Sequence, residues 1–159
     1  APQGNLLAAV ARGHGLWVAV GRAGTILSSP DGATWTQEIA NPKFDLSDVL
    51  WDGAQFVVAG QNGSILTSSD GHLWTLQRSA VSATLRKILW NGSLYVAVGD
   101  GGAIATSADA REWTPRSSGS VSTLRDVAWG GGRFLAVGDS GAIATSSRMH
   151  SSARWCWPR

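Results

Sequence analysis

Residues 85–113, LRKILWNGSLYVAVGDGGAIATSADAREW, contain the unit that decides the fold. One apolar run begins at Leu85, a second follows the pair Asn91 and Gly92, and a third follows a Gly-Asp-Gly-Gly turn. Asn-Gly is typical of a tight hairpin, because both residue types tolerate positive φ. The stretch therefore predicts short antiparallel strands joined by tight turns, with a fourth strand beginning at Trp113.

The same 39-residue unit recurs four times at a constant spacing, with no insertion between copies. The spacing is carried by one leucine and one glycine of each copy: Leu7, Leu46, Leu85 and Leu124, and Gly21, Gly60, Gly99 and Gly138. A regular period of this length is typical of repeat architectures. The copies cover 7–45, 46–84, 85–123 and 124–159, and we expect 1–159 to form one domain.

The second strand of each copy is apolar on both faces, as in Leu94-Tyr-Val-Ala-Val98. One four-stranded unit cannot cover both of its own faces, so neighbouring units must stack face to face. Four short antiparallel strands in one copy have the size of one propeller blade. We therefore predict an all-β fold, a β-propeller of four-stranded antiparallel blades.

A turn of the pattern Ser-x-Asp-Gly/Ala-x-x-Trp separates the third and fourth strands of three copies. The aspartate is placed to accept hydrogen bonds from its own turn, glycine permits a left-handed backbone, and tryptophan folds back as an apolar plug. The residues of this predicted structural motif are Ser29, Asp31, Gly32, Trp35, Ser68, Asp70, Gly71, Trp74, Ser107, Asp109 and Trp113.

These three turns resemble the Asp-box, or bacterial neuraminidase repeat, of sialidases and sortilin-type receptors. The Leu-Arg-x-Ile/Val-x-Trp and Val-Ala-Val-Gly-Asp-x-Gly-Ala-Ile runs look most like photosystem II assembly and stability factor-like proteins. The resemblance covers residues 7–147 and implies that the box is a structural turn at the outer edge of a blade. It also implies a non-catalytic scaffold that binds a protein or peptide partner.

Two alternatives stay open: a fragment of a larger Asp-box glycoside hydrolase, and a glycan-binding propeller. A sialidase needs a tyrosine nucleophile with a glutamate partner, and the only tyrosine, Tyr95, stands at a core-type position. The histidines have no metal-ligand spacing, and no Gly-x-Ser-x-Gly motif is present. We expect no catalytic residue, no metal and no cofactor.

Arg86 and Arg125 occupy the second position of the opening strand, where the first two copies have Ala8 and Ser47. The resemblance makes this the innermost strand, so both guanidinium groups would lie near a central channel. They could bind an acidic peptide or a carboxylate. The competing interpretation is a salt bridge with Asp126 or Asp48.

Trp51, Trp90 and Trp129 recur at one strand position and raise the possibility of a sugar-stacking platform. Burying one such ring removes roughly 150–250 Å² from water. This stabilises a fold by about 4–6 kcal/mol as an upper bound. The strict recurrence of these tryptophans and the free energy gained by burying them favour a role in the packing between blades over a sugar-stacking platform. Arg12 interrupts the series, which fits an end blade without a neighbour.

The fourth copy departs from the pattern, with Arg148 at the aspartate position and Ser152 at the tryptophan position. We expect the last blade to lack its outer strand. Four blades are also fewer than the six to ten typical of the resembling family. We therefore predict either a homodimer that closes an eight-bladed ring or an unclosed arc.

Composition excludes several partner classes. The formal net charge is +2, and basic and acidic residues are interspersed, so nucleic acid is not expected. No apolar stretch is long enough for a membrane span, and the lone Cys156 leaves the redox compartment open. The start, Ala-Pro-Gln-Gly-Asn, fits a mature exported protein, periplasmic or secreted, or an excised fragment.

Overall fold

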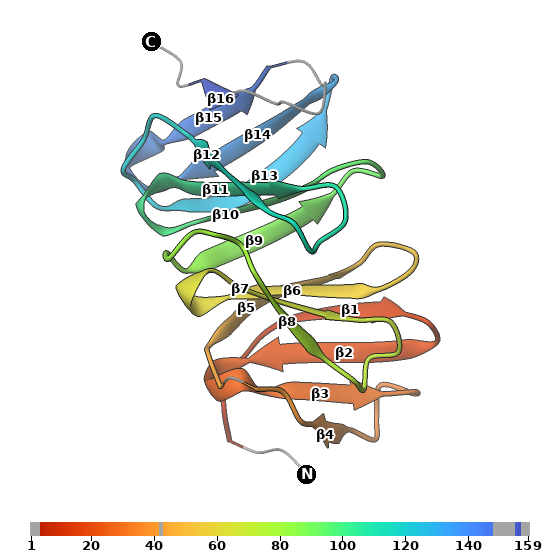
Figure 1. The fold of residues 1–159 in the computed structure, drawn as a ribbon. Helices are drawn as coiled ribbons and strands as arrows, with labels where there is room; N and C mark the ends of the chain where they lie inside the picture. Colours follow the sequence, from red (N-terminus) through yellow and green to blue (C-terminus); the bar gives the residue numbers. More distant parts are fainter. Residues whose placement is uncertain (1–3, 42, 148–154, 157–159) are drawn as a thin grey trace.

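The computed structural model describes residues 4–41, 43–147 and 155–156. These residues form four four-stranded antiparallel sheets, each a simple meander in which consecutive strands pair (Figure 1). The predicted all-β class and the four-stranded blades are confirmed.

Each blade runs from an inner strand to an outer strand. Blade 1 contains β1 (Leu7–Gly13), β2 (Leu16–Gly21), β3 (Ile26–Ser29) and β4 (Thr36–Glu38). Blade 2 contains β5 (Leu46–Trp51), β6 (Phe56–Gly60), β7 (Ser64–Ser68) and β8 (Thr75–Arg78). Blade 3 contains β9 (Leu85–Trp90), β10 (Tyr95–Gly99), β11 (Ala103–Ser107) and β12 (Thr114–Ser117). Blade 4 contains β13 (Leu124–Gly130), β14 (Arg133–Gly138), β15 (Ile143–Ser146) and β16 (Trp155–Cys156).

A one-turn 3₁₀ segment joins the second and third strands of every blade. These segments are Arg22–Gly24, Gln61–Gly63, Asp100–Gly102 and Asp139–Gly141. The glycine just before each one lies against the chain that leads into the inner strand. A Cβ on Gly99 would stand 2.0 Å from the Thr84 carbonyl oxygen. That close approach, where the pairing of β9 and β10 shifts register, explains why glycine recurs at this position in every copy.

The expected face-to-face stacking of blades is present. Val18, Val20 and Ile26 of blade 1 pack with Leu46 and Val49 of blade 2 in one buried cluster. The same positions, one and two copies further along the chain, form the clusters between blades 2 and 3 and between blades 3 and 4. Each inner strand also contacts the inner strand of the next blade. The apolar second strands are therefore buried by neighbouring blades.

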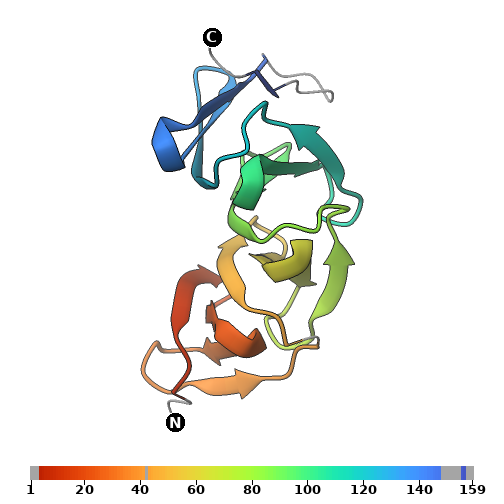
Figure 2. The ribbon, with the colours of Figure 1, turned by 90° about the vertical axis from the view of Figure 1, so that its left-hand side faces the viewer.

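Within one chain the four blades form an unclosed stack. Blade 1 and blade 4 lie at opposite ends in two perpendicular views (Figures 1 and 2). Both predicted arrangements, the homodimeric ring and the unclosed arc, require an open stack in the single chain, and this is what the structure has.

The prediction that blade 4 lacks an outer strand is wrong. The two-residue strand β16 pairs antiparallel with β15, with Thr145 opposite Cys156 and Ser146 opposite Trp155. Backbone hydrogen bonding needs no particular side chain, so a sequence without the Ser-x-Asp turn can still supply an edge strand. The residues at positions 148 and 152, on which the prediction rested, lie outside the described part of the chain.

Candidate functional site

A cavity of about 530 Å³ opens on the side of the stack where the inner strands begin. The 3₁₀ turns after the second strands border it, because antiparallel pairing brings the end of each second strand beside the start of its inner strand. Its lining residues are Leu6, Ala8, Arg22, Asp45, Leu46, Ser47, Gln61, Thr84, Arg86 and Arg125. We call this cavity the inner-strand cavity.

Two repeated positions supply most of the polar lining of the inner-strand cavity. One is the second residue of the inner strand, and the other is the first residue of the 3₁₀ turn in the same blade. In blade 1 these positions hold Ala8 and Arg22, and in blade 2 the uncharged pair Ser47 and Gln61. In blades 3 and 4 they hold an arginine and an aspartate: Arg86 with Asp100, and Arg125 with Asp139.

Arg86 forms a two-pronged ion pair with Asp100. Its Nε lies 2.7 Å from Oδ1 and its Nη2 lies 2.9 Å from Oδ2. Arg125 repeats the arrangement on Asp139, with Nη2 at 2.9 Å from Oδ2 and Nε bonded to Oδ1. The hydrogen bond from each arginine lowers the pKa of its aspartate, and both groups are ionised at neutral pH.

These ion pairs orient the arginines more than they stabilise the fold. The side chain of Arg86 is 43% exposed and that of Arg125 is 60% exposed, and solvent screens ion pairs that are this exposed. Each aspartate occupies only the Nε and Nη2 edge of the guanidinium. The second edge of the planar fork keeps its donors, and this edge matches a carboxylate in shape and charge.

Arg22 adds a third guanidinium to the cavity. Among the described residues, no carboxylate lies within ion-pair distance of it. The nearby Asp45 instead accepts a hydrogen bond from the Ala23 backbone N–H at 2.9 Å. Its own N–H donates to the Gln61 side-chain oxygen at 3.4 Å.

The structure brings the two predicted site residues, Arg86 and Arg125, into this one cavity. The competing interpretation, a salt bridge, is confirmed for both arginines, but the suggested partners were wrong, because the carboxylates are Asp100 and Asp139 and not Asp48 or Asp126. Asp48 is buried and accepts the Ile88 N–H at 3.0 Å from the next blade. Its burial raises its pKa, and Lys87 lies 3.5 Å from it.

Sequence reasoning missed Arg22 as a member of the cavity. The signal was present in the repeat, because Arg22 stands at the position of Asp100 and Asp139. The two positions are 14 residues apart in each copy, and only the register of the hairpin that separates them brings them together.

The three Ser-x-Asp turns lie between the third and fourth strands, away from the inner-strand cavity. Asp70 Oδ1 accepts N–H groups of His72 and Leu73 at 2.8 and 2.9 Å, and the Ser68 hydroxyl at 3.0 Å. Hydrogen bonds from Leu73 and then His72 lower its pKa to about 2. Asp31 and Asp109 make the equivalent bonds, and their pKa values are lowered for the same reason.

In each turn the tryptophan folds back and donates its Nε1–H to a backbone carbonyl earlier in the same turn. The acceptors are Gly32, Gly71 and Ala110, at 3.1, 3.2 and 3.0 Å. The ring of Trp113 is buried, and those of Trp35 and Trp74 are half-buried. The hydrogen bonds of these three aspartates are satisfied by their own turns.

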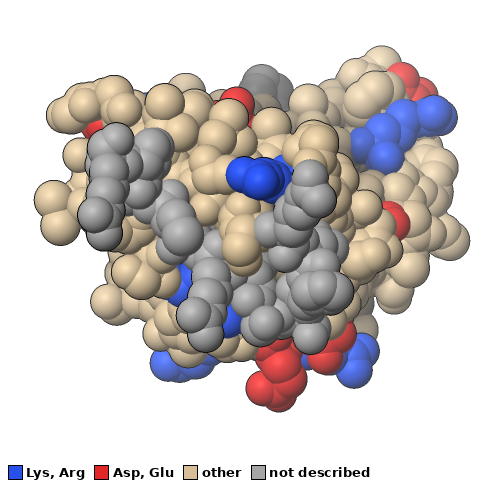
Figure 3. Space-filling view, turned by 90° about the horizontal axis from the view of Figure 1, so that it is seen from above, with Lys and Arg blue, Asp and Glu red and all other residues tan. Residues whose placement is uncertain are grey.

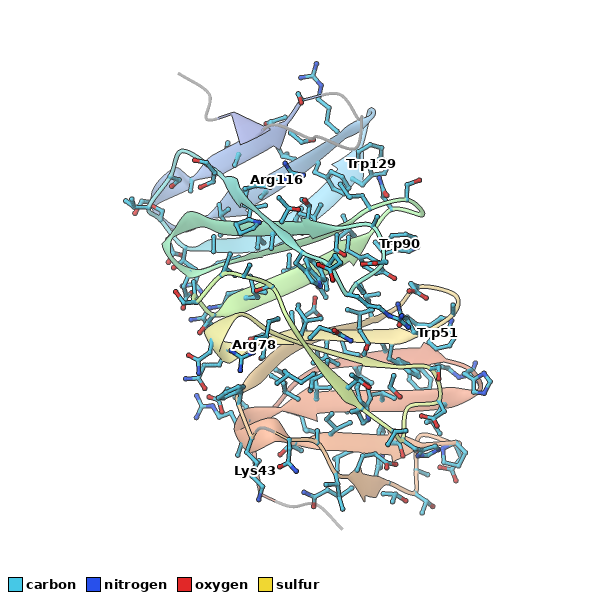
Figure 4. The ribbon with its side chains drawn as sticks, in the orientation of Figure 1. Lys43, Trp51, Arg78, Trp90, Arg116 and Trp129 are labelled. Atoms are coloured by element: carbon cyan, nitrogen blue, oxygen red, sulfur yellow. The ribbon has the colours of Figure 1, made fainter. Side chains whose placement is uncertain are left out.

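The periodic tryptophans Trp51, Trp90 and Trp129 lie one above another at the ends of the inner strands (Figure 4). This edge is opposite the inner-strand cavity, since that cavity is at the strand starts. Trp51 and Trp90 are half-buried and pack into the clusters between blades, and Trp129 is 36% exposed. The aromatic residues paired with them across the hairpin, on the second strands, are better covered. Phe56, Tyr95 and Phe134 are almost inaccessible to solvent.

Neither a metal cluster nor a membrane-crossing helix is found in the described residues. No group of three or more His, Cys, Asp or Glu residues could hold a metal ion there. No helix in this part of the chain is long and apolar enough to cross a membrane.

Comparisons with known proteins match the fold and not the sequence. No protein-family model and no curated protein matches the chain. A structure described as "YCF48 bound to D1 peptide" is similar with a TM-score of 0.70 and 20% identity, over 95% of this chain and 52% of that one. YCF48 from Cyanidioschyzon merolae is similar with a TM-score of 0.71 and 18% identity, over 98% of this chain and 56% of that one.

The computationally designed Ika4 protein is similar over almost its whole length. The TM-score is 0.74 at 10% identity, over 91% of this chain and 92% of that one. This chain spans about half the length of the two YCF48 structures. Four stacked four-stranded meanders with these neighbours show that the chain has the β-propeller fold.

Proposed function

We propose that this chain is a non-catalytic propeller scaffold that binds a carboxylate-bearing peptide in the inner-strand cavity. The observation that carries the proposal is the presence of Arg86 and Arg125 in one cavity, each oriented by an aspartate and each with a second donor edge. Arginine in this state recognises carboxylates by paired, charge-assisted hydrogen bonds.

The rest of the cavity lining suits a peptide. The hydroxyl groups of Ser47 and Thr84 and the amide of Gln61 are hydrogen-bonding groups for a main chain, and the exposed Leu6 adds apolar surface. A cavity of about 530 Å³ is within the range of ordinary ligand sites, about 300–1,000 Å³. The likeness to a peptide-bound YCF48 structure supports the proposal as an analogy of fold.

The test begins with selection of random dodecapeptides displayed on phage against the immobilised chain. The selected sequences are then synthesised, labelled with fluorescein, and titrated by fluorescence anisotropy. We expect Asp or Glu to be enriched at one or two positions, and affinity to fall as salt is raised.

The double substitution Arg86→Gln and Arg125→Gln is expected to weaken binding about 100-fold or more, because both guanidinium groups lose their charge-assisted hydrogen bonds to the peptide carboxylate. Arg111→Gln is the matched control, since it removes the same charge from an exposed turn outside the cavity. Peptides that bind the double variant as tightly as the wild type, or a library without enrichment, would overturn the proposal.

A further inference from the structure

The two ends of the stack expose side chains that are buried everywhere else in the repeat. On blade 4, Leu135, Val137 and Ile143 are 43%, 42% and 41% exposed. The residues at the same positions of the other three blades are fully buried: Val18, Val57 and Val96; Val20, Ala59 and Val98; and Ile26, Ile65 and Ile104. Figure 3 views the stack from this end, and most of the described surface that it shows is neither acidic nor basic.

Blade 1 shows the complementary exposure on its opposite face. Leu7 and Val10 are 45% and 56% exposed. Their equivalents in blades 2 to 4 are at most 6% exposed: Leu46, Leu85 and Leu124, and Val49, Ile88 and Val127. In those blades these residues pack against the preceding blade.

The two exposed faces are therefore the two halves of one interface that the chain already forms three times. A valine and isoleucine surface at positions 18, 20 and 26 meets the leucine and valine of positions 46 and 49. Blade 4 supplies the first surface through Leu135, Val137 and Ile143, and blade 1 supplies the second. We infer that a second copy of this chain docks head to tail, with blade 4 of each copy packed on blade 1 of the other.

A polar contact between blades 2 and 3 supports the same register. Asp48 of blade 2 accepts the backbone N–H of Ile88 in blade 3. Asp126 occupies the position of Asp48 in blade 4, and Val10 occupies the position of Ile88 in blade 1. In the head-to-tail pair, the carboxylate of Asp126 faces the Val10 N–H of the second copy. In the single chain, Asp126 Oδ1 accepts the Val127 N–H at 2.9 Å, and its Oδ2 is the oxygen available for the Val10 N–H.

Two copies are the number that closes the ring. A head-to-tail interface gives a closed ring when its rotation closes, and an open filament when it does not. Propellers typically have four to eight blades, and the resembling family six to ten; two copies of four blades give eight, which is within both ranges, whereas three copies give twelve, which exceeds both. The ring would place both copies of Arg86 and Arg125 around one channel. The inference is independent of what that channel binds.

The test is the mass of the chain in solution, measured by sedimentation equilibrium over a wide range of concentrations. We expect twice the mass of one chain. Val10→Arg and Val137→Arg each put a charge into the interface, and we expect each to raise the dimer dissociation constant about 100-fold or more. Val121→Arg is the control, because Val121 is 91% exposed in a loop and lies on neither face.

Mixing the two variants tests the head-to-tail geometry. In the mixed pair, the Val10→Arg variant keeps an intact blade 4 and the Val137→Arg variant keeps an intact blade 1, so one interface is fully restored. We expect the mixture to associate where each variant alone does not, with unchanged circular dichroism showing that both are folded. Either variant remaining dimeric alone, a monomer at every concentration, or a mass that grows without limit would overturn the inference.

Discussion

Gly99→Ala tests why glycine recurs at the end of every second strand. Gly99 has φ of −171°, an extended conformation that any residue adopts. Backbone strain therefore plays no part. The only obstacle is space, because an added Cβ would stand 2.0 Å from the Thr84 carbonyl oxygen and 2.8 Å from the Leu85 Cα.

The cost of this substitution follows from what must move. Relieving a 2.0 Å contact requires the Thr84 carbonyl to retreat by about 1 Å, and such overpacking costs about 1–3 kcal/mol. The same oxygen accepts the Asp100 N–H at 2.9 Å, and loss of that hydrogen bond adds about 1 kcal/mol. The lower entropy of alanine in the unfolded chain offsets about 0.5 kcal/mol. We expect the free energy of unfolding to fall by about 1.5–3.5 kcal/mol.

Urea unfolding followed by tryptophan fluorescence measures this change, at a concentration low enough to keep the chain monomeric. Gly60→Ala should cost less, because its nearest contact, the Asp45 carbonyl oxygen, lies at 2.5 Å. Gly130→Ala is the control, since an added Cβ meets nothing within 4 Å and its φ is not in the left-handed region. A loss below about 0.5 kcal/mol for Gly99→Ala, or a larger loss for Gly60→Ala, would refute the steric explanation.

Two further predictions concern the turns. Ala23→Gly should raise the free energy of unfolding by about 0.5–1 kcal/mol in the same urea assay. The reason is that Ala23 is exposed and has φ of +54°, where glycine is unstrained. An equal or lower stability of the variant would contradict this. Asp70→Ala should lower it by about 1 kcal/mol, as for a lost helix cap. The pKa of Asp70 is about 2 in the folded chain against 3.8 ordinarily, so its stabilisation is present above about pH 4 and is lost as the pH falls towards 2. Thermal unfolding across this pH range should therefore show a smaller acid-induced fall in Tm for Asp70→Ala than for the wild type, and parallel curves would count against the prediction.

Much of the blade could be predicted because its contacts are local in sequence. The inner strand and the second strand are joined by turns such as Asn91 and Gly92, and predicted strand bounds such as 85–90 agree with β9. The repeat period also predicts that blades stack, since each second strand needs cover on both faces. The fourth strand of each of the first three blades begins just after the expected tryptophan, at Thr36, Thr75 and Thr114.

The candidate site could be predicted only in part. The sequence placed Arg86 and Arg125 on the inner strand by position in the repeat, but their aspartate partners depend on hairpin register. Arg22 belongs to the cavity because its turn folds back beside the start of β1, where the Arg22 N–H donates to the Leu6 carbonyl. The sequence contains no pattern of similar residues that predicts this contact. β16 escaped prediction because backbone pairing with β15 does not depend on the missing turn motif.

The sequence by itself determined the repeating blade, because strand, turn and apolar alternation act within a single copy and are the same in each. Only the tertiary structure decided which copies of an identical position are buried. Val98 is inaccessible and its equivalent Val137 is 42% exposed, although each is the valine of the same Ala-Val-Gly-Asp stretch in its own copy of the repeat. The difference arises because burial between blades depends on having a neighbour, and one chain of four blades leaves two faces without one.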